Sequence, residues 1–523
     1  MAAITLALAG CGGGSPGEII PGASFRGAAV ADEPLAATVA ADILKQGGSA
    51  ADAAVALYFA LAVTYPSAAS LGGGGVCLAS DWRTGEIQSL DFLAPRPART
   101  DSGIRATAVP ANVRGMAALH ARYGILDWRL LLAPAEQMAH FGHTVSRATA
   151  RAMGEGGAVL ASNWDTWRIF AASGELPREG ENFVQTDLAR ILEQLRVRGP
   201  SELYTGALAG QFAEAVRRAG GTLTVEDLRN FVPRWQAAAS MKFGSDRAYF
   251  SPPPAGAGLV AAQMWRMLYD KKRYRRAKSG ERLHLLAETA KRAFEGREKW
   301  RAGDGTEIDM AGLIDRDRSR KAMAGYKRDS AGATGAVAAP SSAPPASVGF
   351  VVVDLLGDTV ACTFTMYESF GSGMVAAGTG VLVAPAPGPD QRNPMSLGPM
   401  IVYNPSIRGF KFAAVGGDGA AGPTAMVSVA AGAMLAKRGR LERAIGQARV
   451  HAPGADNTLL VEEALAAEQV DALAGRGHSV RAAPPLGRVN AIYCASGYPA
   501  EPAKLDCAVE TDPRGYGIAA YPE

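Results

Sequence analysis

SSAPPASVGFVVVDLLGDTVACTFTMYESFGSG, residues 341–373, contains the change of character that decides how this chain is organised. Its first residues are rich in Ala, Pro and Ser, which is typical of a linker. Within a few residues the sequence becomes an apolar β-branched run, 349–353, which predicts a buried strand. Gly357 and Asp358 predict a turn, and 359–366 predicts a second strand. The sequence therefore predicts a hairpin in mid-chain that follows a flexible linker, 330–346.

A linker that ends at a buried strand has two interpretations. It joins two domains, or it contains a peptide bond that is cut, so that the first residue of the strand becomes a new N-terminus. A Ser at such an N-terminus has its own α-amine, with a pKa of about 8, as a general base. Ser347 is the candidate nucleophile in the second interpretation. A single serine in an Ala/Pro-rich segment is more often part of a plain linker, so the motifs around it decide.

Those motifs resemble the γ-glutamyltranspeptidases, a family of N-terminal-nucleophile hydrolases. The family's nucleophile begins a strand that reads Thr-Thr-His-Phe/Tyr-Ser-Val-Val-Asp, and residues 347–354 here read SVGFVVVD. A Gly-Asn turn, a Thr-x-Thr strand and a Phe-Gly-x-Gly follow in the family, and 357–358, 363–365 and 370–373 match them without a gap. The likeness runs from about Gly22 to the C-terminus and includes DEPLAATVAADILKQGGSAADAAVA at 32–56.

The resemblance implies an α+β fold, the four-layer αββα sandwich of the N-terminal-nucleophile hydrolases. It implies one precursor that is cut before Ser347 into a large subunit, 23–346, and a small subunit, 347–523. The two chains of this precursor are expected to stay paired. The chemistry is amide hydrolysis or acyl transfer through an acyl-enzyme on a small-molecule substrate, and it needs no cofactor.

The resemblance also assigns roles to particular residues. Ser347 stands at the nucleophile position, and the hydroxyl that matches Thr365 contacts the nucleophile in the family. A glycine-rich turn, 415–424, separates a predicted strand from a predicted helix, where free backbone N–H groups suit an oxyanion. The places of the family's oxyanion-hole donors are Gly419 and Ala420, although these residues also fit an ordinary turn.

The residues that hold a glutamyl group in the family are altered here. The Arg that binds the substrate's α-carboxylate has no counterpart in Asp-Phe-Leu-Ala-Pro, 91–95, and Arg96 is the displaced candidate. The acidic residue that binds the α-amine corresponds to Asp390, one place late in its loop. Of the family's paired serines only Ser396 remains, and Tyr367 replaces an Asn. Loss of a bidentate Arg–carboxylate contact weakens recognition of a γ-glutamyl group.

Three functions stay open at this point. The first is a γ-glutamyl hydrolase or transferase that acts on compounds such as glutathione. The second is an amidase of the same fold with a non-glutamyl acyl substrate, and the third is a non-catalytic binding or structural relative. No metal is expected, because Glu136, His140 and His143 fit the end of an amphipathic helix and no further ligand accompanies them.

The first residues, MAAITLALAGCGGGSPG, resemble a bacterial lipoprotein signal in which Cys11 is lipidated and becomes the mature N-terminus. Residues 1–22 are then a signal and tether, and the protein is periplasmic or in the cell envelope. No Lys or Arg precedes the apolar run, so either the true start of the signal lies upstream or this is an ordinary disordered terminus.

The remaining composition adds two expectations. The net charge of +4 is slight for 523 residues and gives no reason to expect a nucleic-acid partner, and membrane contact is expected only through the lipid anchor. In an oxidising compartment Cys494 and Cys507 are expected to form a disulfide. Cys77 and Cys362 lie in apolar strand contexts and are expected to be buried thiols.

Overall fold

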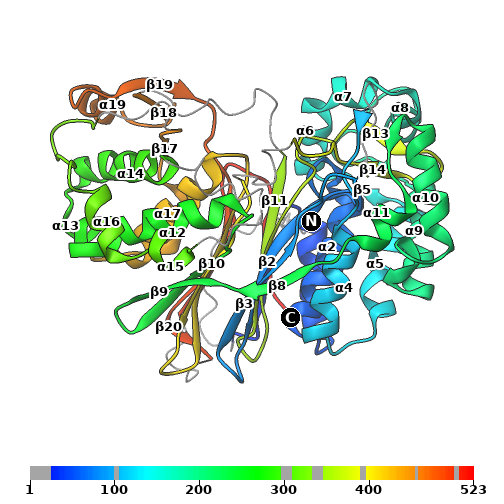
Figure 1. Cartoon of the computed structure of the whole chain (residues 1–523), viewed down its shortest axis with the longest axis horizontal. Coiled ribbons are helices and arrows are strands. Elements are labelled where there is room, and N and C mark those ends of the chain that lie inside the picture. The colour runs from blue at the N-terminus through cyan, green and yellow to red at the C-terminus, as the bar shows by residue number, and fades with distance from the viewer. Residues whose placement is uncertain are drawn as a thin grey trace, which may run out of the picture.

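Two antiparallel sheets stacked face to face, each covered by helices on its outer side, make up the molecule (Figure 1). The structure is a computed structural model that describes residues 25–98, 105–295, 309–332, 346–388, 396–453, 457–499 and 506–523. Separate apolar cores lie between the sheets and between each sheet and its helices. The predicted four-layer αββα sandwich is confirmed.

The first sheet has seven strands in the order β22-β1-β11-β12-β2-β3-β8, and the second has six in the order β21-β20-β16-β15-β10-β9. Their bounds, first sheet and then second, are β22 Ile518–Ala520, β1 Ala28–Ala31, β11 Ser347–Val353, β12 Thr359–Thr365, β2 Gly74–Asp81, β3 Glu86–Phe92, β8 Arg234–Ala237; β21 Cys507–Glu510, β20 Val489–Tyr498, β16 Gly409–Gly416, β15 Met400–Asn404, β10 Asp246–Phe250, β9 Ala239–Phe243.

Short strands form smaller sheets at the edges of the sandwich. They are β4 Arg105–Ala106 with β7 Gly221–Thr222, β5 His143–Thr144 with β6 Asn182–Phe183, β13 Met374–Ala376 with β14 Val381–Val383, and the three strands β17 Val450–His451, β18 Thr458–Glu462 and β19 Ser479–Ala483.

The helices divide between the two outer layers (Figure 1). Those on the side of the first sheet are α1 Pro34–Lys45, α2 Ala50–Thr64, α3 Pro66–Ala69, α4 Asn112–Tyr123, α5 Trp128–Phe141, α6 Arg147–Glu155, α7 Gly157–Ala161, α8 Trp164–Phe170, α9 Thr186–Arg198, η1 Pro200–Leu203, α10 Ala207–Arg218 and α11 Val225–Asn230. Those on the side of the second sheet are α12 Gly256–Tyr269, η2 Asp270–Lys272, α13 Arg273–Arg276, α14 Ser279–Phe294, α15 Met310–Leu313, α16 Arg316–Ala322, α17 Ala421–Met434, α18 Leu441–Gly446 and α19 Ala467–Ala474.

The predicted hairpin is the centre of the first sheet. β11 and β12 pair so that Ser347 faces Thr365, and all fourteen of their residues are buried. Gly357 turns the chain with φ +89°, a conformation that glycine adopts without a steric penalty. Because β11 pairs with β1 and β12 pairs with β2, the hairpin lies between two strands from the N-terminal part of the chain.

The N-terminal helices begin at residues that are typical of helix starts. Pro34 begins α1, and α2 follows a capping box in which Ser49 and Asp52 bond to each other's backbone N–H groups. All fifteen residues of α2 are buried, which explains why its sequence is apolar on every face. None of the described helices has the length and apolar character that crossing a membrane requires.

The cysteines show one confirmed and one wrong prediction. Cys494 and Cys507 are disulfide-bonded, as expected. Cys77 and Cys362 are not free thiols, because they also form a disulfide, between β2 and β12. The two residues face each other directly in the strand register, and this long-range pairing is invisible in the local sequence.

Candidate active site

Ser347 lies at the point where the linker enters the sheet. It is the first residue of β11 and is 1% exposed, and the preceding Ala346 is the first described residue after the linker. The Ala346–Ser347 peptide bond therefore lies at the edge of the first sheet, where β11 begins. The bond to be broken and the candidate nucleophile are therefore both in place.

The hydroxyl of Thr365 is hydrogen-bonded to this peptide group. Its Oγ1 donates a hydrogen bond of 2.7 Å to the carbonyl oxygen of Ala346. The backbone N–H of Tyr367 donates to the same Oγ1 at 2.9 Å, so one lone pair of the hydroxyl is occupied and its hydrogen is directed at the carbonyl. This geometry polarises the carbonyl and stabilises negative charge that develops on its oxygen.

The glycine-rich turn between β16 and α17 forms the other side of the site. The backbone N–H of Asp418 donates to Ser347 Oγ at 3.1 Å. Gly417 also lies close to Ser347, because a Cβ added to it would stand 3.2 Å from the carbonyl oxygen of Ser347. Gly419 and Ala420 follow in the same turn and precede the first residue of α17. Their role as oxyanion-hole donors stays a prediction, and the donor that touches Ser347 Oγ lies one residue earlier.

An ion pair fixes the conformation of this turn. Asp418 has φ +64°, in the left-handed region that a residue with a side chain rarely adopts. Its carboxylate takes two hydrogen bonds from Arg488, of 2.7 and 2.8 Å, and Arg488 also donates to the hydroxyl of Tyr65. The carbonyl of Arg488 accepts the N–H of Gly417 at 2.8 Å. Arg488 therefore holds the turn from its backbone and its side chain.

A buried carboxylate supports β11 two residues beyond the nucleophile. Asp32 accepts the N–H of Gly349 at 3.4 Å and the amide of Asn490 at 3.0 Å, while Asn490 donates to the carbonyl of Gly349 at 2.9 Å. Burial raises the pKa of Asp32, and the positive charge of Arg488 opposes that rise. Burial likewise opposes the charge on Arg488, but Tyr65, Asp418 and Asp32 together raise its pKa well above the ordinary value.

Sequence reasoning missed this supporting set. The glycine-rich turn was recognised, but the left-handed Asp418 and its partners Arg488, Asp32 and Asn490 were not. A signal was present for Asp418 alone, because it lies inside the recognised turn. The other three residues come from segments that only the fold brings together.

Of the three predicted substrate-binding residues, the structure describes Arg96 and Ser396. Arg96 is exposed, and its Nη1 donates at 3.4 Å to the carbonyl of Pro387, so it lies beside the loop that leads to Asp390. Asp390 itself lies outside the described residues. Ser396 is buried at the other end of this loop, and in the ranges that the structure describes it makes no hydrogen bond with Ser347.

Tyr367 occupies the space between the hairpin and the segment after β3. Its hydroxyl donates at 2.7 Å to the carbonyl of Ala94, two residues before Arg96. Tyr367 has φ +64°, which costs on the order of 1 kcal/mol for a residue with a side chain. The phenol ring of Tyr367 is thus fixed beside the predicted glutamyl site.

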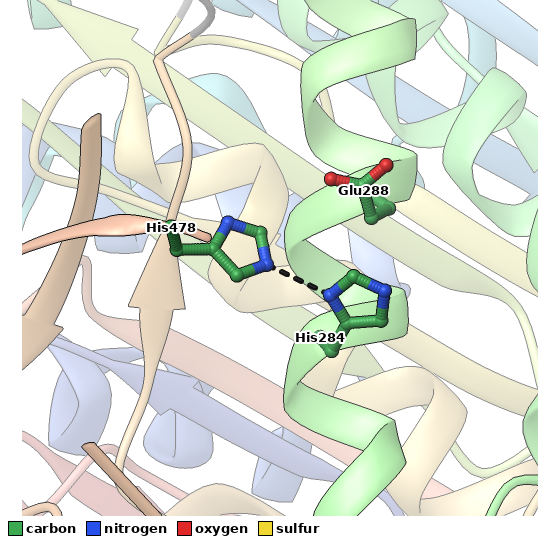
Figure 2. A group of neighbouring side chains, drawn as sticks. All are labelled: His284, Glu288 and His478. Carbon is green, nitrogen blue, oxygen red and sulfur yellow. Dashed lines mark hydrogen bonds between the residues drawn. The ribbon is translucent and has the colours of Figure 1, made fainter. Parts of the chain in front are cut away.

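A second cluster of polar side chains lies in the helical layer of the second sheet. Figure 2 shows His284 and Glu288 on α14 facing His478, which lies just before β19. His284 Nε2 is bound to the carbonyl of Lys327 and so carries the hydrogen, which leaves Nδ1 to accept from His478 Nε2 at 2.8 Å. Within the described ranges this is the one group of such residues whose ligand atoms lie within 4.8 Å of one another.

The neighbours of this cluster favour a structural contact over a metal site. Glu288 is already paired with Arg292 at 2.5 Å and with the buried Lys291 at 3.3 Å. A divalent cation would add its charge to two cations that share one buried carboxylate, where charges are screened less than at the surface. The histidines expected at a helix end do not form a site either, since Glu136 is paired with Arg196. The expectation of no metal stays a prediction.

A family model described as Gamma-glutamyltranspeptidase matches residues 36–521. The chain belongs to the γ-glutamyltranspeptidase family. The glutathione hydrolase proenzyme of Escherichia coli (strain K12) is 30% identical to this family member over 382 residues, which cover 68% of this chain and 66% of that protein. The match therefore spans about two thirds of the relative's length.

A second relative in the γ-glutamyltranspeptidase family comparison aligns with a larger part of both chains. The Acylase ACY 1 proenzyme of Pseudomonas sp. (strain V22) is 30% identical over 522 residues, which cover 90% of each chain. Among solved structures, cephalosporin acylase from Bacillus halodurans has a TM-score of 0.81 and 22% identity, covering 99% of this chain and 100% of that chain, which shows the fold. The γ-glutamyltranspeptidase from Pseudomonas nitroreducens complexed with L-DON has a TM-score of 0.52 and 28% identity over 57% of this chain and 94% of that chain.

These matches confirm the predicted family and fold. The named relatives are hydrolases and acylases, so the chain is placed among the enzymes of its family, as the sequence predicted.

Proposed function

We propose that this protein is an amide hydrolase or acyltransferase that cuts its own chain before Ser347 and then uses Ser347 as an N-terminal nucleophile. The observation that carries the proposal is the hydrogen bond from Thr365 Oγ1 to the carbonyl of Ala346, next to a serine hydroxyl that accepts from Asp418 N–H. The contact places a hydroxyl donor on the carbonyl oxygen that becomes negatively charged when Ser347 attacks Ala346. The large subunit is then 23–346 and the small subunit 347–523.

The cut follows from these contacts. Ser347 Oγ attacks the carbonyl carbon of Ala346, and the negative charge that forms on the carbonyl oxygen is stabilised by Thr365. The C–N bond breaks, the nitrogen of Ser347 takes up a proton, and an ester joins Ala346 to Oγ. Water then hydrolyses the ester, which leaves a carboxylate on Ala346 and a free amine and hydroxyl on Ser347.

Turnover uses the groups that the cut releases. The α-amine of Ser347 accepts the proton of Oγ as it attacks the substrate amide, and the leaving amine takes that proton. The acyl group then rests on Oγ until water or an amine removes it. The backbone N–H groups of Gly419 and Ala420 are the proposed oxyanion donors, and Asp418 N–H holds Ser347 Oγ.

The first proposed substrates are γ-glutamyl compounds such as glutathione, in keeping with the family. A second candidate is an amide with a non-glutamyl acyl group. Two observations favour it: the Tyr367 hydroxyl is bonded to Ala94 beside Arg96, and the alignment with an acylase proenzyme covers 90% of both chains. Asp390, Arg96 and Ser396 are the proposed substrate-binding residues in either case.

Initial rates with two matched chromogenic amides decide between these substrates. γ-Glutamyl-p-nitroanilide has the α-amine that the family recognises, and glutaryl-p-nitroanilide has the same carbon chain without it. Faster hydrolysis of the γ-glutamyl amide supports the first candidate, and faster hydrolysis of the glutaryl amide supports the second. A processed enzyme without activity on any acyl amide would contradict both and favour a binding role.

The proposed location is the periplasm or cell envelope, with a lipid on Cys11. Two disulfides among the described residues support it, because disulfides persist in oxidising compartments. Metabolic labelling of the full chain with a radioactive fatty acid tests the anchor. Label that is present in the wild type and absent from Cys11→Ser is expected, and label that remains in the variant would refute the assignment.

A further inference from the structure

A cavity on the outer side of the second helical layer is surrounded by positive charge. It has a volume of about 410 Å³ and lies between the end of α12, the short helix α13 and α16. Six of its lining residues are cations: Lys271, Lys272, Arg273, Arg276, Arg316 and Arg320. In Figure 1, α13 and α16 lie at the outer edge of the molecule, well away from β11.

Very little negative charge balances these six cations. Asp270 is the acidic residue in the lining, and its nearest cation is Arg266 from α12, at 3.7 Å. Arg320 pairs with Asp317 on its own helix. Among the residues that the structure describes, the other five cations of the lining have no ion pair, and the potential in the cavity is therefore strongly positive.

Some exposed arginines elsewhere in this protein are paired with carboxylates. Arg147 lies 2.8 Å from Glu179, and Arg151 lies 2.8 Å from Glu155 one helical turn away. A solvated charged face usually mixes the two signs in this way. Two unit charges about 6 Å apart repel by roughly 0.7 kcal/mol even in bulk water, and six cations around one cavity add many such pairs. A multiply charged anion would remove this repulsion.

The local fold fixes where the cations stand. Lys271 and Lys272 are consecutive residues with φ of 54° and 53°, and they reverse the chain between α12 and α13. The guanidinium of Arg273 donates to the carbonyl of Met267 at 2.9 Å, and burial lowers its pKa. Arg316 and Arg320 are one turn apart on α16, so their side chains lie on the same face of that helix.

We propose that this cavity binds a phosphate-bearing anion that carries more than one negative charge. Arginine forks match the oxygens of a phosphate in pairs, and lysines add charge at single points. The volume is at the lower end of the range for small-molecule pockets, which fits one or two phosphate groups. Nucleic acid is a poorer candidate, because it binds best to rows of exposed aromatic rings. Here Tyr274 is buried, and Tyr269, the aromatic residue of the lining, is partly buried with its ring against Phe243.

Calorimetric titration of the full-length protein with pyrophosphate at low ionic strength tests this site. The variant Arg276→Gln/Arg316→Gln removes two exposed cations from the cavity. The control Lys437→Gln/Arg438→Gln removes two exposed cations outside the cavity, so both variants have the same net charge. We expect at least tenfold weaker binding in the first variant and a change of less than twofold in the control.

Two sources can supply such an anion, a soluble phosphorylated molecule or the headgroup of an anionic lipid, and vesicles separate them. Sedimentation with phosphatidylglycerol vesicles that is lost in Arg276→Gln/Arg316→Gln, with phosphatidylcholine vesicles as control, indicates the headgroup. Pyrophosphate binding without such sedimentation indicates the soluble molecule. Equal behaviour of wild type and Arg276→Gln/Arg316→Gln towards both probes would overturn the proposal, and circular dichroism checks that both variants are folded.

Discussion

At the scale of single residues, the cut depends on the hydroxyl of Thr365. Thr365→Val keeps the shape of the side chain and removes the donor to the Ala346 carbonyl. Loss of one oxyanion donor typically slows an acyl-transfer step by about 10²-fold or more. We therefore expect slow or absent processing, measured as the fraction of cut chain against time after purification.

Thr365→Ser is the matched control for this change. It retains the hydroxyl that donates to Ala346 and accepts from Tyr367 N–H, so processing is expected to stay within about tenfold of the wild type. Equal processing in the Val and Ser variants would show that the hydrogen bond to Ala346 has no part in the cut.

Arg488 is expected to position the donor at Ser347 rather than to touch the substrate. Arg488→Lys keeps the positive charge and loses the two-pronged contact with Asp418, so the left-handed turn is held less firmly. We expect roughly a tenfold lower kcat with little change in KM, because Asp418 N–H serves the reacting oxygen and not ground-state binding.

The exposed variant Arg83→Lys is the control, since Arg83 lies in the turn between β2 and β3 and is 74% exposed. If Arg488→Lys raised KM and left kcat unchanged, Arg488 would belong to substrate binding instead.

At the scale of elements, the disulfide between β2 and β12 joins the two chains that the cut produces. Cys77 lies in the proposed large subunit and Cys362 in the small one. After processing, the protein should therefore migrate as one band in denaturing gels without reductant and as two bands with reductant. The physical reason is that the cut breaks the backbone 15 residues before Cys362 and leaves the S–S bond intact.

Two variants make this test specific. Cys362→Ala should give two bands without reductant, because it removes the bond between the chains. Cys507→Ala should still give one band, because Cys494 and Cys507 both lie in the small chain. Two bands from unreduced wild-type protein would show that Cys77 and Cys362 are not paired.

The histidine contact between α14 and the start of β19 predicts how stability depends on pH. Burial, together with the charges of Lys291, His284 and Arg476, lowers the pKa of His478 to about 4, and Glu288 opposes this shift. The folded protein therefore keeps His478 neutral, and the unfolded chain takes up the proton below a pKa of about 6.5. The stability that depends on this residue is complete above that pH and is lost as pH falls towards 4.

Urea unfolding at pH 7 and pH 5 measures this effect. His478→Gln keeps a donor to His284 without a titrating group. Between pH 7 and pH 5 its free energy of unfolding should fall by about 2 kcal/mol less than that of the wild type. His140→Gln, at an exposed histidine, should behave as the wild type. Equal losses in the wild type and His478→Gln would contradict the assignment.

At the scale of the whole molecule, patterns that are local in the chain predicted their elements well. The apolar run before Gly357 predicted β11, and Ser49 with Asp52 predicted the start of α2, because strand patterning and helix caps act within a few residues. The resemblance supplied the sandwich and the position of Ser347, which composition alone would not have given.

Features that depend on strand register or on backbone conformation were not predicted. Cys77 and Cys362 are adjacent only because β2 pairs with β12, and each has an apolar neighbourhood that suits a free thiol equally well. Asp418 reaches Ser347 because it adopts a left-handed conformation that sequence assigns to glycine first. The basic run 271–276 does not predict a cavity by itself, because the arginines of α16 that complete the lining follow some 40 residues later.

The measurement that tests the central claim most directly is intact mass with N-terminal sequencing of the reduced, purified protein, beside Ser347→Ala. Two chains in the wild type, the smaller beginning Ser-Val-Gly-Phe, and one uncut chain in the variant are the predicted result. A single uncut chain in folded wild-type protein, or a cut at another bond, would contradict the role of Ser347 as an N-terminal nucleophile.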